Sequence, residues 1–184
     1  SLLLAGPALA ANFLVVVADD LGVDGVEVYS RDDLYGHVGE GASPGPTPTI
    51  NELAAQGMLF RNAYAYSQCS PTRATTLTGR YGFRTGIGTP GGALLDLAET
   101  TIAELLAPTH ATAAVGKWHI GAGDIDHPID QGFDTYAGPL SNVGDYTSWD
   151  KTTNSSTTAG TTTSGVMTYV TTDNADEARA AILA

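Results

Sequence analysis

Cys69 is the only cysteine of the 184-residue chain, and its surroundings suit a reactive side chain. A single cysteine forms neither an internal disulfide nor a thiolate zinc site, so it is either an inert buried residue or a chemical participant. We expect a helix with Ser70 as N-cap, Pro71 in the first turn and Gly79 at its end. A helix N-terminus and Arg73 both favour an anion at Cys69. A phosphatase-like nucleophile stays open, although the five-residue spacing between Cys and Arg that such a site uses is absent.

Two adjacent carboxylates, Asp19 and Asp20, follow a short apolar run over Asn12 to Ala18. The β-branched composition of the run predicts a buried parallel strand. Like charges at the end of such a strand repel each other unless a cation or hydrogen bonds compensate them. Either the carboxylates hold a hard divalent metal, with Ca²⁺ preferred and Mg²⁺ or Mn²⁺ as alternatives, or one caps a turn and the other is solvated.

Lys117 and His119 lie in the block Gly116 to Gly121, directly after a predicted strand over Ala111 to Val115. Each has a plain alternative, since Lys117 would otherwise be a solvated surface charge and His119 a hydrogen-bonded core histidine. Their position at a strand end favours functional roles for both. The other histidines lack such a context, and we expect them to be structural or surface residues: His37, His110 and His127.

Helical and strand patterns alternate along the chain. The predicted helices cover Thr49 to Gly57, Ser70 to Gly79, Thr100 to Leu106 and Asp173 to Leu183, with Thr49 and Thr100 as caps. A further strand is predicted over Met58 to Ala65, and a loop over Asp32 to Pro48. Ten of the thirteen residues from Thr152 to Ser164 are Ser or Thr, which predicts a low-complexity loop. The alternation predicts an α/β fold with a largely parallel sheet flanked by helices.

The net charge of −12 argues against nucleic acid or an anionic membrane as a partner. No apolar run of eighteen residues occurs, so we expect no membrane-spanning helix. Residues 1–11 are similar to the end of a signal peptide with an Ala-Leu-Ala cleavage site, which predicts export to the periplasm or the outside of the cell. The alternative is that they are an apolar lead-in to the predicted strand over residues 12–18. Four of the eight cations surround Cys69 and suit an anionic ligand there: Arg61, Arg73, Arg80 and Arg84.

Three segments of the chain resemble the type I sulfatases, which belong to the alkaline-phosphatase superfamily. Cys69-Ser70-Pro71-Thr72-Arg73, continued to Gly79-Arg80, resembles the signature that directs oxidation of the cysteine to formylglycine. Thr72 stands where Ser is frequent, and the Cys, Pro and Arg of the signature are kept. Gly116 to Gly121 is similar to a second family element, and Asp19-Asp20 to the first metal-binding segment. The resemblance covers residues 12–140, including Pro48 to Ala54 and Gly132 to Asp134.

The resemblance implies a sulfuric ester hydrolase that acts on a sulfated small molecule or carbohydrate. Position 69, oxidised by a formylglycine-generating enzyme, would present two hydroxyls as its hydrate, one to attack sulfur and one to expel sulfate afterwards. Asp19, Asp20 and position 69 would hold the metal. Arg73 would hold position 69, Lys117 would contact a sulfate oxygen, and His119 would bond a hydroxyl of position 69.

The chain departs from the resembled family in length. Family members are considerably longer, and their second half supplies an Asp-Asn metal pair and further leaving-group residues. Asp173-Asn174 opens a predicted helix, so we do not assign it to the metal. We expect residues 12–184 to be the N-terminal portion of a sulfatase catalytic domain, truncated and inactive or poorly folded alone. Two alternatives stay open: a formylglycine-dependent phosphate or phosphonate ester hydrolase, and a noncatalytic protein that keeps the fold.

Overall fold

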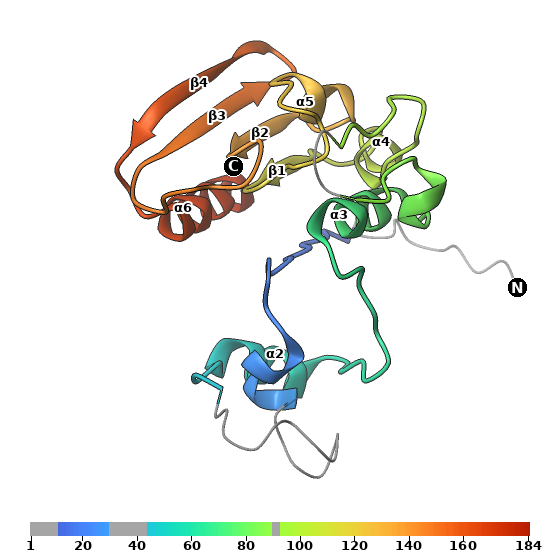
Figure 1. Cartoon of the computed structure of the whole chain (residues 1–184), viewed down its shortest axis with the longest axis vertical. Helices are drawn as coiled ribbons and strands as arrows, with labels where there is room; N and C mark the ends of the chain where they lie inside the picture. Colours follow the sequence, from blue (N-terminus) through green and yellow to red (C-terminus); the bar gives the residue numbers. More distant parts are fainter. Residues whose placement is uncertain (1–10, 30–43, 90–92) are drawn as a thin grey trace, which may run out of the picture. The chain divides into compact units, whose positions relative to one another are not determined.

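The computed structural model describes residues 11–29, 44–89 and 93–184. His37, the predicted signal-peptide remnant up to residue 10 and most of the predicted loop over residues 32–48 lie outside these ranges. The chain divides into two units (Figure 1). Unit 1 consists of residues 1–13 and 66–184, and unit 2 of residues 14–65. Among the described residues, no helix has the length and apolar character needed to cross a membrane.

A four-stranded sheet in the order β1-β2-β3-β4 organises unit 1. β1 (Ala113–Val115) and β2 (Thr135–Gly138) are parallel, whereas β3 (Trp149–Ser155) pairs antiparallel with β2 and with β4 (Thr158–Val166). The predicted α/β class is confirmed, but the sheet is mixed and only one of its three strand pairs is parallel. For the β3–β4 pair the reason is the two-residue connection, which is too short for a parallel crossover.

The β3–β4 hairpin occupies the segment that we predicted to be a Ser/Thr-rich loop, so that prediction was wrong. Threonine is β-branched and fits a pleated strand, and its hydroxyl also bonds across a strand pair. The hydroxyls of Thr152 and Thr162 are 2.8 Å apart, and those of Thr153 and Thr161 are 3.4 Å apart. The Ser/Thr-rich segment, whose composition is typical of a linker, therefore forms two strands of the sheet, and hydroxyl pairs across these strands support them.

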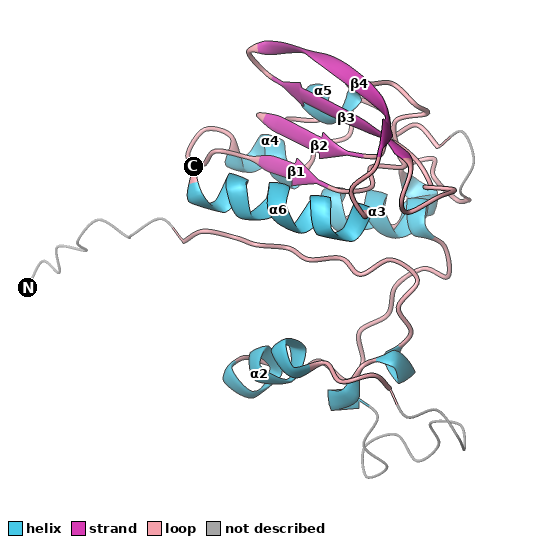
Figure 2. Cartoon of the chain, turned by 90° about the vertical axis from the view of Figure 1, so that its left-hand side faces the viewer, coloured by secondary structure: helices cyan, strands magenta, loops and turns pink. Residues whose placement is uncertain are grey.

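Four α-helices and one 3-10 helix accompany the sheet: α3 (Cys69–Thr78), η3 (Gly82–Arg84), α4 (Ile102–Leu106), α5 (His127–Asp130) and α6 (Val170–Leu183). Figure 2 shows α6 and α3 lying on the same side of the sheet, with α6 running beside β1. α6 contacts β1 and β2, and α5 contacts β2. The helices predicted from residues 70, 100 and 173 are confirmed, although α6 begins three residues earlier than predicted.

Two predicted helix caps in unit 1 were displaced. Gln68, not Ser70, is the N-cap of α3, and it makes no side-chain cap bond. The cap of α4 is Thr101 instead of Thr100, because Thr101 and Glu104 bond each other's backbone amides in a capping box. Gly79 ends α3 in the left-handed conformation, as predicted, with a φ of 66°.

The core of unit 1 lies around Trp118, whose side chain is only 5% exposed. Its neighbours in the core are Ala74, Ile87, Leu95, Ile120 and Tyr136. The indole nitrogen of Trp118 donates to Nδ1 of His127 at 3.0 Å, and Nε2 of His127 bonds the Leu95 carbonyl at 2.8 Å. His127 is therefore the structural histidine that the sequence predicted, and it fixes the tryptophan that follows Lys117.

Unit 2 contains α2 (Pro48–Gln56) and two 3-10 helices, η1 (Val23–Gly25) and η2 (Glu27–Tyr29). The predicted helix over residues 49–57 is confirmed, but its N-cap is Thr47 and not Thr49, because Pro48 takes the first helical position. Gly57 follows with a φ of −116°, so the helix ends without the left-handed glycine that commonly closes one. The carboxylate of Glu27 bonds Asn51 at 2.6 Å and so joins η2 to α2.

The strands predicted over residues 12–18 and 58–65 are not formed. The residues from Phe13 to Val17 are all exposed, from 47% for Val17 to 81% for Val16. A buried parallel strand needs hydrogen-bonded neighbours and cover on both faces. Among the described residues, neither segment pairs with a strand, so an apolar β-branched composition by itself did not produce one.

Candidate active site

Cys69 is the first residue of α3, at the helix N-terminus where the sequence predicted it. Its thiol is free and partly buried. Pro71 follows in the first turn, where a missing amide hydrogen costs the helix nothing because the first four amides have no intrahelical partner. The unpaired amides of this turn favour negative charge at Cys69.

Lys117 and His119 lie on a segment, residues 117–119, that continues directly from β1. In this segment Trp118 and Ile120 are buried in the core, while Lys117 and His119 stay partly exposed. The amides of Trp118 and His119 donate to carbonyls of the segment that follows β2, those of Pro139 and Leu140. Burial of Trp118 and Ile120 thus anchors a segment whose two polar residues remain accessible.

Glycine allows this pairing to come close. Gly138 at the end of β2 has a φ of 155°, and a Cβ built on it would lie 2.3 Å from the carbonyl oxygen of Gly116. That carbonyl also accepts the hydroxyl of Tyr136 at 3.1 Å. Burial raises the pKa of Tyr136 above its ordinary value, and the positive charge of Arg73 offsets part of the rise. Tyr136 therefore stays a neutral hydrogen-bond donor behind the site.

Three contacts join the first turn of α3 to the 117–119 segment, although 44 to 50 residues separate them in sequence. Sγ of Cys69 lies 3.2 Å from Nδ1 of His119. The hydroxyl of Ser70 donates to the His119 carbonyl at 2.8 Å, and the guanidinium of Arg73 donates to the Lys117 carbonyl. The structure thus brings the side chains of Cys69 and Arg73 to the segment that carries Lys117 and His119, with the Cys69 thiol beside the His119 ring and Arg73 on the Lys117 backbone.

The backbone at two predicted site residues is strained. Among the described residues, only three residues other than glycine have a positive φ: Asp20 at 55°, His119 at 58° and Ala122 at 49°. Asp and His tolerate this region better than most residues, and such conformations cluster at functional sites. The outliers therefore support functional hypotheses for Asp20 and His119.

Asp19 and Asp20 belong to unit 2, whereas Cys69 belongs to unit 1. The positions of the two units relative to each other are not determined (Figure 1), so the aspartates are not placed against Cys69. Within the described part of the chain, no three His, Cys, Asp or Glu side chains are grouped closely enough to hold a metal. The metal set of Asp19, Asp20 and residue 69 stays a prediction.

The arginines predicted to make the surroundings of Cys69 cationic have different positions. Arg73 bonds the 117–119 segment, but Arg80 pairs with Glu99. The guanidinium of Arg84 lies 5.9 Å from the ring centroid of Phe83. Arg61 belongs to unit 2. Within unit 1, Arg73 is therefore the arginine of this group that contributes to the candidate site.

Sequence analysis missed the contact of Ser70 with His119. The pattern Ser-Pro at the start of a helix is typical of an N-cap, and this local interpretation competed with a long-range one. The structure shows Ser70 fully buried inside the first turn, which no local signal in the sequence indicates. Tyr136 was missed for a similar reason, since its donor role depends on where Gly116 lies.

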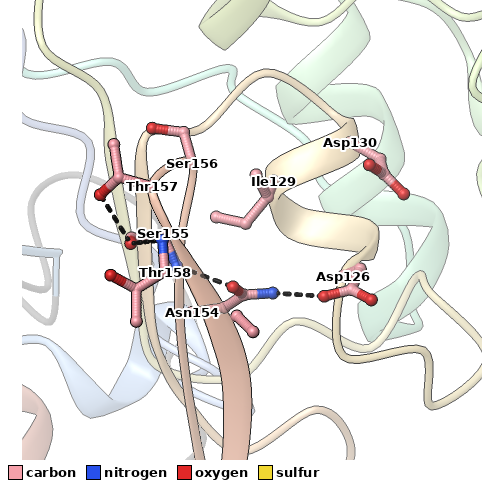
Figure 3. A pocket seen from close by; sticks show the side chains of 9 residues that line it. Asp126, Ile129, Asp130, Asn154, Ser155, Ser156, Thr157 and Thr158 are labelled. Atoms are coloured by element: carbon pink, nitrogen blue, oxygen red, sulfur yellow. Dashed lines mark hydrogen bonds between the residues drawn. The ribbon is translucent and has the colours of Figure 1, made fainter.

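Two cavities lie away from the candidate site. Figure 3 shows one of about 350 Å³ between α5 and the β3–β4 turn, in which Asn154 points toward Asp126 and bonds it at 2.8 Å. The other, of about 440 Å³, is lined by residues 94–97 together with Asp124, His127 and Asp130. Neither is lined by Cys69 or His119. The Asn154 bond joins β3 to Asp126, the residue before α5.

Comparison with known proteins identifies the family of the chain. Residues 11–183 match the family described as Sulfatase. Because the match covers nearly the whole chain, the chain belongs to the sulfatase family.

Several named sulfatases are similar in sequence. Arylsulfatase G of Rattus norvegicus is 38% identical over 141 residues, which are 71% of this chain and 24% of that protein. Steryl-sulfatase of Mus musculus is 37% identical over 161 residues, 77% of this chain and 24% of that protein. N-acetylgalactosamine-6-O-sulfatase of Bacteroides thetaiotaomicron is 41% identical over 119 residues, 61% of this chain and 21% of that protein. The chain thus spans about a quarter of the length of these relatives.

Solved structures share the fold. The crystal structure of Ps i-CgsB matches with a TM-score of 0.60 at 32% identity, over 71% of this chain and 28% of that one. PsFucS1 sulfatase from Pseudoalteromonas sp. matches with a TM-score of 0.54 at 30% identity, over 70% of this chain and 25% of that one. The predicted sulfatase-like α/β fold is therefore confirmed.

Proposed function

We propose that the protein is a sulfuric ester hydrolase that works through a formylglycine at position 69. The observation that carries this proposal is the 3.2 Å contact between Sγ of Cys69 and Nδ1 of His119 at the N-terminus of α3. Membership of the sulfatase family supports the reaction class. The modification would be made by a formylglycine-generating enzyme that reads Cys69, Pro71 and Arg73.

Formylglycine at this position supplies, as its hydrate, one hydroxyl that attacks sulfur and a second whose deprotonation expels sulfate. His119 Nδ1 lies beside position 69 and would take the proton of the second hydroxyl. Lys117, a partly exposed residue, would bind a sulfate oxygen through its ammonium as a fixed cation. Arg73 would act differently, because its bond to the Lys117 carbonyl holds α3 against the 117–119 segment.

Asp19 and Asp20, with an oxygen of the modified residue 69, would hold a divalent metal. Carboxylate and hydroxyl oxygens are hard ligands, so the donor set fits Ca²⁺, with Mg²⁺ or Mn²⁺ as alternatives. The left-handed backbone at Asp20 is the feature of this structure that supports a special role for the pair. The ion would polarise the sulfate oxygens and lower the pKa of the attacking hydroxyl.

A sulfated carbohydrate is the substrate class that the relatives favour. One relative is named N-acetylgalactosamine-6-O-sulfatase, and one Ps i-CgsB structure is a complex with k-i-k-neocarrahexaose. The net charge of −12 supports the absence of nucleic acid and anionic membranes as partners. We retain export to the periplasm or the outside as part of this proposal, on the Ala-Leu-Ala pattern within residues 1–11.

The test compares matched aryl sulfate and aryl phosphate esters as substrates. It uses a form of the protein as long as its relatives, produced with a formylglycine-generating enzyme and assayed with and without Ca²⁺. We expect hydrolysis of the sulfate ester, lost on chelation of the metal and reduced about 10²-fold or more by His119→Ala. His110→Ala is the matched control, because His110 bonds Thr109 and the Ala11 carbonyl instead of Cys69.

Preference for the phosphate ester would replace the sulfatase proposal with a phosphoester hydrolase of the same superfamily. Equal losses from His119→Ala and His110→Ala would contradict the role of His119 at position 69.

A further inference from the structure

Ser70 follows the candidate nucleophile in sequence, yet its side chain bonds a distant segment of the chain instead of capping α3. It is fully buried, with 0% of the residue exposed. Its hydroxyl donates to the His119 carbonyl at 2.8 Å. A buried hydroxyl without a partner is costly, so this bond accounts for a polar side chain at that depth.

The backbone of His119 is held from two sides. Its amide donates to the Leu140 carbonyl at 2.9 Å, in the segment after β2, and its carbonyl accepts from Ser70 in α3. Between these two bonds the residue has a φ of 58°. Strained conformations of this kind persist only where the surrounding structure over-determines them.

The orientation of the His119 ring depends on this backbone, because a change in φ swings Cβ and the imidazole with it. With the backbone as described, Nδ1 lies 3.2 Å from Sγ of Cys69. Cys69 and Ser70 are consecutive residues of one helical turn. One turn of α3 therefore carries both the group that His119 contacts and the group that holds His119.

We propose that Ser70 is a positioning residue, whose hydroxyl fixes the left-handed backbone of His119 and thereby directs its imidazole at position 69. The proposal rests on the proposed function for its catalytic meaning. Its geometric content is separate, because it concerns the coupling of two side chains in the unmodified chain. Ser70 itself contacts neither substrate nor reacting atoms in this account.

The test measures alkylation of the Cys69 thiol by iodoacetamide, followed on the tryptic peptide that contains it. It uses a form as long as the relatives, produced without the formylglycine-generating enzyme. His119 Nδ1, 3.2 Å from Sγ, can take the thiol proton as the sulfur reacts. Ser70→Thr and Ser70→Val form the matched pair, because both add a methyl group and only the first keeps the hydroxyl. Ser70→Ala removes the hydroxyl without added volume. Each variant is made with His119 present and with His119→Ala, which gives a double-mutant cycle.

With His119 present, we expect Ser70→Ala and Ser70→Val to slow alkylation about threefold or more, and Ser70→Thr to retain most of the rate. With His119→Ala, we expect the three substitutions to differ by less than about 1.5-fold. Alkylation in concentrated urea is the control, and there all variants should react alike.

Equal slowing by Ser70→Ala in both His119 backgrounds would overturn the proposal, because a loss of packing alone acts without His119. No slowing with His119 present would overturn it as well. Failure of the sulfatase assay with intact coupling between Ser70 and His119 would contradict the proposed function and leave the positioning role standing.

Discussion

The predicted helix at Cys69 is present in the structure, whereas the apolar run over residues 12–18 does not form the predicted strand. Both precede or contain polar residues with candidate roles. The first turn of α3 makes three contacts with the 117–119 segment, which in turn rests on the core around Trp118. The run from Phe13 to Val17 leaves about half or more of each side chain exposed.

Contacts with the sheet and the core, more than local composition, therefore decide whether a segment takes the structure that its sequence pattern predicts. Between Lys117 and Ile120, the apolar residues Trp118 and Ile120 are buried because the core of unit 1 surrounds them. The β-branched run before Asp19 has no strand partner among the described residues. We therefore regard the Cys69 side of the proposed site as pre-organised, and the aspartate side as dependent on further packing.

The largest expected effect is that of removing the proposed nucleophile. Cys69→Ala should reduce sulfate ester hydrolysis by at least about 10³-fold in the full-length form, because no other residue supplies the attacking oxygen. The variant should keep its fold, since Cys69 is only partly buried. Measurement of hydrolysis alongside circular dichroism separates the two effects. Activity within tenfold of the parent would disprove covalent catalysis at this position.

The second prediction compares an apolar side chain from each region. Trp118→Ala should lower the free energy of unfolding by about 3–5 kcal/mol, because it leaves a cavity in the core. Val16→Ala should change it by less than about 0.5 kcal/mol, since Val16 is 81% exposed. Urea denaturation followed by circular dichroism measures both. Similar losses from the two substitutions would show that the regions do not differ in packing.

The third prediction concerns the close approach between Gly138 and Gly116. Gly138→Ala should destabilise the chain by about 1–3 kcal/mol, because the added methyl group would meet the Gly116 carbonyl. Gly144→Ala is the control, since a Cβ built there has no atom within 4 Å. The midpoints of thermal unfolding report the difference. If both substitutions are neutral, the backbone pairing after β1 is not as tight as described.

The smallest expected effect concerns the polar contact between β3 and α6. Lys151, with 14% of its side chain exposed, bonds Asp173 at 2.7 Å and Glu177 at 2.6 Å. Burial lowers its pKa, but these two carboxylates outweigh that effect and raise it above the ordinary value of 10.5. Lys151→Met should cost about 1 kcal/mol near neutral pH.

Because the folded-state pKa of Lys151 is raised, its contribution to stability is complete below the unfolded-state pKa and is lost as pH rises through the folded-state value. The difference between parent and Lys151→Met should therefore be constant up to about pH 10 and shrink above it. Arg179→Met, an exposed cation on the same helix, is the control. A difference that grows with alkaline pH would contradict the sign of this prediction.

The sequence predicted the helices better than the strands. α2, α3, α4 and α6 carry capping or periodic signals within one segment, and each is present. The β3–β4 hairpin was missed because Thr152 and Thr162 recognise each other only after the strands have met. The run before Asp19 was overpredicted for the opposite reason, since its pattern specifies a buried face but not the elements that would cover it.

The sequence also located most of the candidate site. Cys69, Arg73, Lys117 and His119 were selected from family-like motifs, and the structure brings the segments that carry them together, with contacts from Cys69 to the His119 ring and from Arg73 to the Lys117 carbonyl. The hydroxyl of Ser70 and the left-handed backbone of His119 depend on how α3 docks, so no pattern within one segment predicts them. The packing of α3 against the 117–119 segment, and not either motif alone, therefore forms this side of the candidate site.

The most direct test of the central claim is mass spectrometry of the tryptic peptide from Asn62 to Arg73, after the chain is produced together with a formylglycine-generating enzyme. Our account predicts the mass of an aldehyde at position 69 in the parent and an unmodified thiol in the control variant Pro71→Ala. An unmodified thiol in the parent, with the enzyme shown to convert a known sulfatase, would contradict the account.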